Sequence, residues 1–557
     1  MAFDGIVTKG VVTELNKNLK GAKVNKILQP NKNEVVLCLY SKDGEKYNIL
    51  ISVLPEACRL HLTTHLKPNP SNPFNFCMLL RKYLIGSKIL EVSNYDLERT
   101  IEIKFEARNE LNDLVKRRLY IEIMSRQSNI VLTNENNTII DCLKHFEDDK
   151  RPRLPASPFT FTPILKSSFI DIETFDEFCE LISNSQEEKL SSKLPEIFIG
   201  FSKNFIFKCL EILNINDINY QIEDLDKLYN YLKKLINNFE INHVKTDVIG
   251  KDYTLINSLQ KEDKLEINNF LNEFYFEKEQ KNLFNSSKNN LLRIVSSSLK
   301  KVYRKLENIN QKLKECDNMD KYRLYGELLT ANLYRLNCDQ NLNEVEVLNY
   351  YTNENIKIPL DTKYNVNKNV ERFYKKYNKL KNTLEIVSVQ KKEAVKEIDY
   401  IESIIYSLDS AKSMEEINQI YSEISENIVV NSNSSKKISK KKEEIKIQEV
   451  EFNGYKIYVG KNNSQNDYLT FSLASREDLW FHAQKIHGSH VIIKTSGQEE
   501  IPEEVIFEAA RLAKENSKGA ASSVVPVDYC KLKFVKRAQS RKLGMVNYTS
   551  FNTILVK

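Results

Sequence analysis

Apolar and polar residues alternate along the first part of the chain in a pattern that predicts a domain of mixed helices and strands. Val11, Val12, Leu15 and Leu19 share one face of a predicted helix over residues 8–19. A second helix is predicted for Phe76–Ile85. Five segments have the period-two alternation of strands: Glu34–Tyr40, Tyr47–Val53, Thr100–Phe105, Arg118–Met124 and Asn129–Leu132. A proline-rich stretch at 150–163 marks the end of this α/β or α+β domain, which we place at residues 1–165.

Residues 170–275 are expected to be helical. Within them, Leu194–Leu210 predicts two helices joined by a tight Ile-Gly-Phe-Ser turn. Such a hairpin directs the backbone N–H groups of its second helix outward, where they can bind phosphate. Ser202 stands where the phosphate-binding hairpin has a second glycine, so the sequence alone favours an ordinary pair of packed helices.

Two later segments carry the heptad signature of paired helices. Apolar residues recur at alternating three- and four-residue spacing from Leu292 to Cys316, and again from Tyr377 to Leu408 with one break at Lys391. We predict an antiparallel coiled-coil hairpin over residues 280–425, with arms of roughly 40–50 Å. Residues 317–370 between the arms are predicted to form a small globular insert with a helix and strand-like residues.

The last part of the chain is predicted to be a separate α/β domain. Residues 426–448 form a lysine-rich linker with too few apolar side chains to build a core. Residues 449–557 then return to strand-like alternation, which includes Asp467–Leu473. A helix at Glu503–Asn516 and a basic stretch follow.

Length and composition point to an intracellular protein of several domains. A chain of 557 residues exceeds what one compact core holds. The net charge of +6 is mild support for a polyanionic partner. The nine cysteines lack any CxxC pair, as expected of reduced, buried thiols, and neither a signal peptide nor a membrane span is recognisable. We therefore expect a cytoplasmic protein.

Residues 460–493 have the most unusual composition in the chain. They combine the only tryptophan with three of the seven histidines, several amides and glycines, and almost no acid beside the rings. Rings with amide and basic side chains suit stacking on bases and contact with phosphate and 2′-hydroxyl groups, as in RNA binding. The candidate RNA-binding residues are Lys461, Asn462, Asn463, Trp480, His482, His487 and His490. Zinc ligation and a structural role remain alternatives for the histidines, although no cysteine lies nearby and no HExxH motif occurs.

Signs of catalysis are missing from the sequence. No phosphate loop or nucleophile elbow occurs, and isolated carboxylates such as Glu122 are more often solvated or ion-paired than catalytic. Arg99, just before the strand at 100–105, is placed at the edge of an apolar face for a bidentate or stacking contact. An ion pair with Glu98 is the plainer interpretation. We expect no enzyme activity, no cofactor and no metal.

Several long motifs resemble the NFACT family of ribosome quality control factors. They occur in the same order along nearly the whole chain. The motifs are Phe3–Gly5, Phe76–Leu84, Leu119–Thr133, Tyr325–Tyr334, Val459–Thr470, Asp478–Ile493 and Ser522–Tyr529.

The resemblance implies a multidomain α+β architecture. An N-terminal domain like that of formamidopyrimidine glycosylases is followed by a helix-hairpin-helix region, a coiled-coil hairpin with an insert, and a C-terminal RNA-binding domain. The family's tRNA-binding positions correspond to Glu98 and Arg99, and to Glu122, Ile123 and Met124. The family's usual acid at the first position is aspartate, so Glu98 departs from the pattern.

The resemblance also implies the partners. These are large ribosomal subunits obstructed by peptidyl-tRNA, a charged tRNA that is expected to be tRNA-Ala, and a small S4-like RNA-binding partner. Such a factor would promote template-independent tailing of the stalled nascent chain, marking it for degradation. Two alternatives are a surface adhesin for fibronectin and a DNA-repair glycosylase. Ala2 argues against the glycosylase, since those enzymes use a proline nucleophile at that position.

Overall fold

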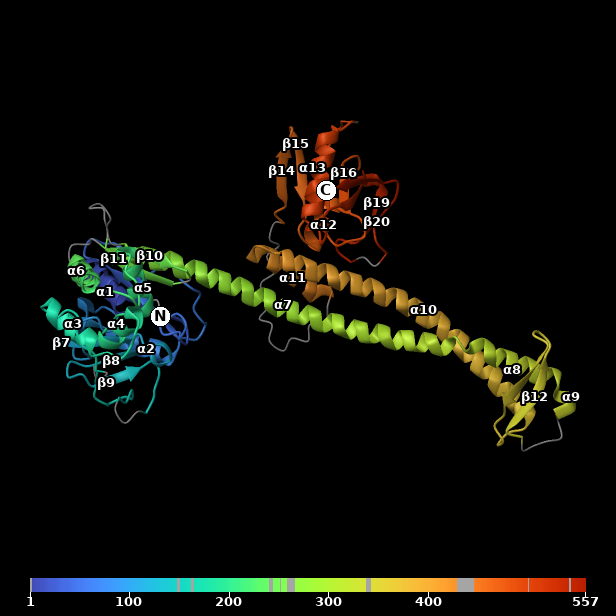
Figure 1. The fold of residues 1–557 in the computed structure, drawn as a ribbon, viewed down its shortest axis with the longest axis horizontal. Coiled ribbons are helices and arrows are strands. Elements are labelled where there is room, and N and C mark those ends of the chain that lie inside the picture. The colour runs from blue at the N-terminus through green and yellow to red at the C-terminus, as the bar shows by residue number, and fades with distance from the viewer. Residues whose placement is uncertain are drawn as a thin grey trace. The chain divides into compact units, whose positions relative to one another are not determined.

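The computed structural model describes residues 3–147, 151–161, 165–239, 244–250, 252–257, 266–336, 342–427, 445–498, 500–539 and 542–557. The chain divides into two compact units, Met1–Gln280 and Lys281–Lys557 (Figure 1). The chain is a multidomain α+β protein with long helices and antiparallel sheets. Most of the predicted lysine-rich linker, 426–448, lies outside the described residues.

A nine-stranded antiparallel sheet forms the centre of unit 1, in the order β4-β3-β2-β1-β5-β6-β7-β8-β9. Its strands are β1 (Lys23–Asn31), β2 (Glu34–Tyr40), β3 (Lys46–Ser52), β4 (Arg59–Leu62), β5 (Lys88–Asn94), β6 (Thr100–Arg108), β7 (Leu114–Glu122), β8 (Asn129–Thr133) and β9 (Ile139–Cys142). Helices α1 (Gly5–Leu19) and α2 (Asn75–Leu84) pack their apolar faces into its core, and the short η1 turn (Ser125–Gln127) follows β7. The five predicted strands and two predicted helices are all present, with ends shifted by a few residues.

The remainder of unit 1 adds helices to the same core. These are α3 (Phe175–Ser183), α4 (Leu190–Ile197), α5 (Lys203–Leu213) and α6 (Ile222–Asn238). The expectation that residues 170–275 are helical is wrong over a hairpin formed by β10 (Val244–Ile249) and β11 (Asp252–Asn257). The β-branched residues there alternate with polar ones, and Gly250 supplies the positive φ of 59° that the tight turn requires.

The paired helices of the predicted coiled coil are α7 (Ile267–Cys316) and α10 (Val366–Ser410). Contacts from Lys288 to Asp409, from Tyr303 to Glu402 and from Cys316 to Leu380 advance along one helix and retreat along the other, so the pair is antiparallel as predicted. The helices have 50 and 45 residues, or about 70 Å each, and exceed the expected arm length. The heptad run covers only part of each helix, which explains the difference.

An insert joins the two long helices. It contains α8 (Met319–Ala331), α9 (Leu333–Leu336), β12 (Glu344–Asn349) and β13 (Glu354–Pro359) around a small apolar cluster of its own. Helix α11 (Met414–Asn427) follows α10 and packs against it.

The C-terminal part of unit 2 contains a six-stranded antiparallel sheet in the order β14-β15-β17-β16-β18-β21. Its strands are β14 (Gln448–Phe452), β15 (Tyr455–Val459), β16 (Leu479–Ala483), β17 (Val491–Ile493), β18 (Val525–Lys531) and β21 (Asn552–Val556). Helix α13 (Glu503–Glu515) covers one face. The short elements α12 (Asn463–Tyr468), η2 (Leu469–Leu473), η3 (Leu532–Phe534), β19 (Val535–Arg537) and β20 (Val546–Tyr548) complete the unit.

The prediction of a strand at Asp467–Leu473 is wrong, because α12 and the π-helical turn η2 occupy these residues. Asn462 begins this helical segment by accepting a hydrogen bond from the N–H of Gln465 at 2.8 Å. Period-two alternation over seven residues does not reveal such a cap.

Eight of the nine cysteines lie within the described residues as free thiols, and six of these are buried. None of the helices in the described ranges is both long enough and apolar enough to cross a membrane.

Candidate nucleic-acid interface

Glu98 and Arg99 lie in the turn that joins β5 to β6. The side-chain amide of Asn94 donates to the carbonyl oxygens of Asp96, at 2.9 Å, and Glu98, at 3.2 Å, which fixes the turn. Leu97 is fully buried beneath it, whereas Glu98 and Arg99 are half-buried. The turn is therefore anchored from below and presents its two charged side chains at the surface.

Two helix N-termini meet beside this turn at Asp4. One carboxylate oxygen of Asp4 accepts from the N–H of Val7 at 3.0 Å and caps α1. The other accepts from the hydroxyl of Ser202 at 2.6 Å, and Ser202 itself caps α5. Burial raises the pKa of Asp4 to about 6, while these hydrogen bonds and the positive charge of Arg99 act in the opposite direction. Ser202, which departs from the phosphate-binding hairpin pattern, thus has a structural role here.

Two glycines allow this close approach. The N–H of Gly5 donates to the carbonyl of Gly200 at 2.9 Å. A Cβ atom on Gly5 would collide with the backbone of Leu97 and Gly200, and Gly200 has a φ of 79°. Residues at these two positions must therefore lack a side chain for α1, the α4–α5 turn and the β5–β6 turn to touch.

Glu122, Ile123 and Met124 lie next to Arg99 in the sheet. Thr100 pairs with Glu122 across β6 and β7, and the N–H of Ile123 donates to the carbonyl of Arg99 at 3.1 Å. Ile123 is buried, and Met124 is half-buried with its N–H bonded to the hydroxyl of Ser128 at 2.8 Å. The structure therefore brings the two groups of predicted tRNA-binding residues together.

Glu122 is nevertheless a buried ion-pair partner. Its carboxylate accepts two hydrogen bonds from Arg153, at 2.7 and 3.1 Å, and lies 3.6 Å from Arg151. The side chains of Glu122 and Arg153 are 1% and 0% exposed. Direct contact of Glu122 or Ile123 side chains with RNA is excluded in this conformation, and both residues support the Arg99 turn from behind.

The C-terminal candidate residues follow the two-sided character of the six-stranded sheet. Leu479, Phe481 and Ala483 face α13, so Trp480 and His482 point to the opposite face by alternation. Trp480 is 0% exposed there and packs against Leu469, Ile492 and Cys530. The expectation that its ring stacks on an RNA base is wrong for this conformation, because the ring is part of the core.

His482 and His490 lie edge to face beside Trp480, with ring centroids 5.4 Å apart. His490 is buried, and its Nδ1 lies 2.7 Å from the hydroxyl of Thr470. Burial lowers the pKa of His482 to about 4 and that of His490 well below its ordinary value, so both rings are neutral at pH 7.

The amides Asn462 and Asn463 bind neighbouring helices. Asn462 donates to Gln419 of α11 at 2.8 Å. Asn463 donates to Glu423 of α11 and to Ser403 of α10, both at 2.9 Å. The side chains expected to contact RNA are thus occupied in attaching the C-terminal sheet to α10 and α11.

Glu423 is the centre of this attachment. Its carboxylate also accepts from the hydroxyl of Tyr400 at 2.8 Å. Burial raises the pKa of Glu423 to about 7, although the Asn463 and Tyr400 hydrogen bonds lower it. Lys461 is half-buried, with its Nζ 3.8 Å from Glu416 of α11.

A cavity of about 450 Å³ lies where these residues meet α10. Of the seven predicted RNA-binding residues, five line it, namely Lys461, Asn463, His482, His487 and His490. The half-buried ring of His487 has its Nε2 3.7 Å from Asp399 and 3.8 Å from Glu402. The residues predicted to bind RNA therefore line a cavity, although no cavity was predicted from the sequence.

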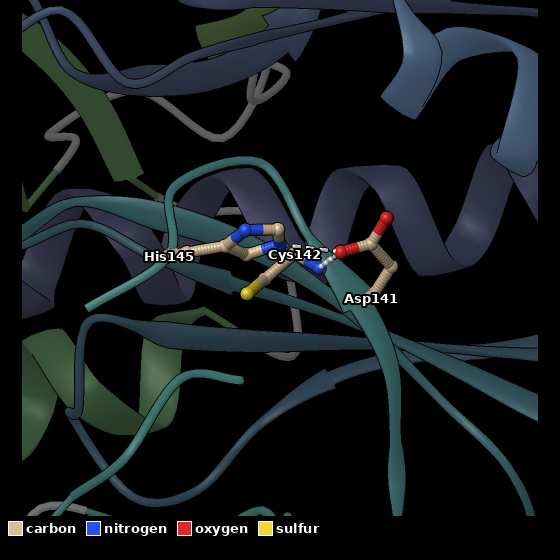
Figure 2. Close-up of side chains that lie close together, drawn as sticks. All are labelled: Asp141, Cys142 and His145. Atoms are coloured by element: carbon tan, nitrogen blue, oxygen red, sulfur yellow. Dashed lines mark hydrogen bonds and ion pairs between the residues drawn. The ribbon is translucent and has the colours of Figure 1, made fainter. Parts of the chain in front are cut away.

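The histidines of this segment do not form the metal site that the sequence left open. Among the described residues, the group with three ligand atoms within 4.8 Å of one another is Asp141, Cys142 and His145 (Figure 2). The Cys142 thiol points away from the Asp141 carboxylate and donates to the carbonyl of Arg153 at 3.0 Å. Burial raises the pKa of Cys142 to about 12, which disfavours the thiolate that a metal would need. Asp141 and His145 form a simple pair at 2.6 Å.

Comparison with known proteins identifies the family. The chain matches the model of the NFACT N-terminal and middle domains over residues 4–443 and that of the NFACT protein RNA binding domain over residues 447–547. It is 34% identical to the Rqc2 homolog RqcH of Bacillus subtilis (strain 168), covering 100% of this chain and 98% of the relative. It is 31% identical, with the same coverage, to the Rqc2 homolog RqcH of Streptococcus pneumoniae serotype 2.

A solved structure of the C-terminal part of the fibronectin/fibrinogen-binding protein from Streptococcus suis is 30% identical, covering 49% of this chain and 95% of that one, with a TM-score of 0.39. The family models and the full-length relatives show that the chain belongs to the NFACT family and ends in an RNA-binding domain.

Proposed function

We propose that this protein is a ribosome quality control factor that binds large ribosomal subunits obstructed by peptidyl-tRNA. In this proposal it recruits a charged tRNA, alanyl-tRNA, so that the stalled nascent chain is extended without a template and marked for degradation. The observation that carries the proposal is the similarity over the whole chain to proteins named Rqc2 homolog RqcH.

Arg99 is the residue that we propose to contact tRNA. It is half-buried on an anchored turn, and a guanidinium group binds phosphate or stacks on a base with little reorganisation. Glu98 lies next to it, while Met124 borders the turn. Glu122 and Ile123 hold the strand behind Arg99 through the ion pair with Arg153 and the backbone bond to Arg99.

The protein itself would carry out no bond chemistry. In this proposal, it holds the tRNA and the obstructed subunit together, and the ribosome forms the peptide bond. We place the protein in the cytoplasm, with a small S4-like RNA-binding protein as a further partner. The finer domain assignments, a glycosylase-like N-terminal fold and a helix-hairpin-helix at α4–α5, belong to the same proposal.

The test is to recover the tagged protein from cells and to sequence the RNA bound to it. We expect large-subunit ribosomal RNA and one strongly enriched tRNA. Recovery of neither RNA would contradict the proposal.

Two further assays separate the alternatives. A fibronectin adhesin would be found outside unlysed cells, so fractionation distinguishes it from a cytoplasmic factor. A glycosylase would cleave duplexes that carry oxidised or abasic lesions when incubated with the purified protein. Either result would favour another function.

A further inference from the structure

The cavity between α10 and the C-terminal sheet has a neutral floor. His482 and His490 line it, and both are uncharged at pH 7 because burial lowers their pKa values. Their ring nitrogens already have partners, Thr470 for His490 and the backbone of Gly488 and Ala483 for His482, so the two rings offer uncharged flat faces, which suit a nucleobase better than a phosphate. Tyr406 and Tyr548 add aromatic rings to the lining.

The rim of the same cavity is cationic. Lys396 on α10 and Lys485 after β16 both line it, and both are exposed. Neither lysine forms an ion pair within the described ranges of the chain. Asp399 also lines the cavity, and its carboxylate lies 3.7 Å from Nε2 of His487.

The dimensions limit what this combination can bind. About 450 Å³ lies within the size range of pockets for small organic ligands and is too small for a duplex. A ligand that places a flat polar ring on a neutral floor and an anion at a lysine rim has the chemistry of a nucleoside phosphate. Bases stack on aromatic side chains regardless of sequence, which suits the rings present here.

We propose that this cavity binds a single nucleotide, with the base against His482 and His490 and the phosphate at Lys396 and Lys485. Such a nucleotide could be a free nucleoside monophosphate or an unstacked nucleotide within a single-stranded RNA. The RNA source rests on the proposed function, whereas the pocket chemistry does not.

The experiment uses the full chain and two free probes, AMP and adenosine, in calorimetric titrations. AMP is expected to bind, and adenosine to bind more weakly because it lacks the phosphate. Lys396→Ala and Lys485→Ala are each expected to weaken AMP binding on the order of tenfold, as loss of a phosphate contact does. Lys392→Ala, an exposed lysine of the same helix that does not line the cavity, is the matched control and should leave binding unchanged.

His482→Ala tests the floor by removing the ring. It is expected to weaken AMP and adenosine in the same proportion, whereas the lysine variants weaken AMP alone. Circular dichroism verifies that this variant is folded. If it is not folded, the variants of the exposed lysines still test the proposal. Failure of AMP to bind the wild type, or equal weakening by Lys392→Ala, would overturn the proposal.

A competition arm separates the two sources. If a short single-stranded RNA displaces AMP from the wild type, the pocket takes a nucleotide from RNA; if the RNA leaves AMP bound, it takes the free nucleotide. Both outcomes support the pocket. Binding to large ribosomal subunits is measured separately. If AMP does not bind but the subunits do, this inference is wrong and the proposed function is unaffected.

Discussion

The turn that carries Arg99 and the segment 460–493 were both predicted to contact RNA, and their structures differ in one respect. In unit 1, the charged residues at the front are half-buried and a buried layer supports them. In the C-terminal segment, the most unusual residue, Trp480, is fully buried and belongs to the supporting core. An unusual concentration of rings and amides can therefore form the wall of a cavity instead of an exposed contact surface.

The physical reason lies in what surrounds each side chain. Arg99 lies in the anchored turn just before β6 and is half-buried. Trp480 occupies an inward position of a strand in the middle of its sheet, and that sheet is covered on both faces.

Replacing the buried ring should have the largest effect. Trp480→Ala is expected to destabilise the C-terminal sheet by about 3 to 5 kcal/mol, because it removes a fully buried aromatic side chain. Hydrogen exchange of peptides from β16 and β18 measures the loss. Phe507→Ala, a half-exposed ring on α13, is the control and should cost far less. Unchanged protection in the Trp480 variant would show that the ring is not structural.

Breaking the buried ion pair behind Arg99 should come next. Arg153→Ala leaves Glu122 without its two-point partner in the core, which is expected to cost about 3 kcal/mol. Hydrogen exchange in β7 and β8 provides the measurement, with Arg108→Ala at the exposed end of β6 as control. Equal protection in the two variants would contradict the supporting role of Glu122.

The attachment through Glu423 should depend on pH. Its folded-state pKa of about 7 exceeds the ordinary 4.5, so the folded protein takes up a proton before the unfolded chain does. The contribution of Glu423 to stability should therefore grow as the pH falls from 8 to 5, by up to about 3 kcal/mol, while the lowered pKa values of His482 and His490 act in the opposite direction below about pH 6.5.

Urea unfolding followed by the emission of Trp480, the only tryptophan, measures this dependence. Glu423→Gln should remove the Glu423 contribution, because the amide does not titrate, so the stability difference between the wild type and this variant should grow as the pH falls. Glu426→Gln, an exposed acid of the same helix, should not change the pH dependence. A variant at Glu423 that keeps the full pH dependence would refute this assignment.

Replacing Arg99 should have the smallest effect on folding and a clear effect on binding. Arg99→Ala is expected to lose about 2 kcal/mol of tRNA affinity, the size of a strong interface contact. Arg99→Lys keeps the charge but not the planar fork and should recover only part of it. Filter binding with purified tRNA measures both, and wild-type affinity in the alanine variant would remove Arg99 from the interface.

Regular periodicity made much of the fold predictable. The heptads gave the antiparallel pairing of α7 and α10, and the apolar face of residues 8–19 gave α1. The β10–β11 hairpin and α12 escaped prediction because each is short, and because a glycine turn and an asparagine cap decide them locally.

The site was predictable only in part, for a related reason. Family resemblance predicted Arg99 and Glu122 as tRNA-binding residues, and the pairing of β6 with β7 places them near each other. The contact of Asp4 with Ser202 spans 198 residues, and no local pattern reveals such a pair. The partner of Glu122, Arg153, lies within the proline-rich stretch at 150–163, and nothing in that stretch predicted a buried ion pair.

The most direct test of the central claim is sedimentation of the purified protein with isolated large ribosomal subunits at increasing salt. We predict co-sedimentation at low ionic strength and a steep loss as salt rises, because lysine and arginine contacts to phosphate release counterions. Protein that stays in the supernatant with these subunits at low ionic strength would contradict the account.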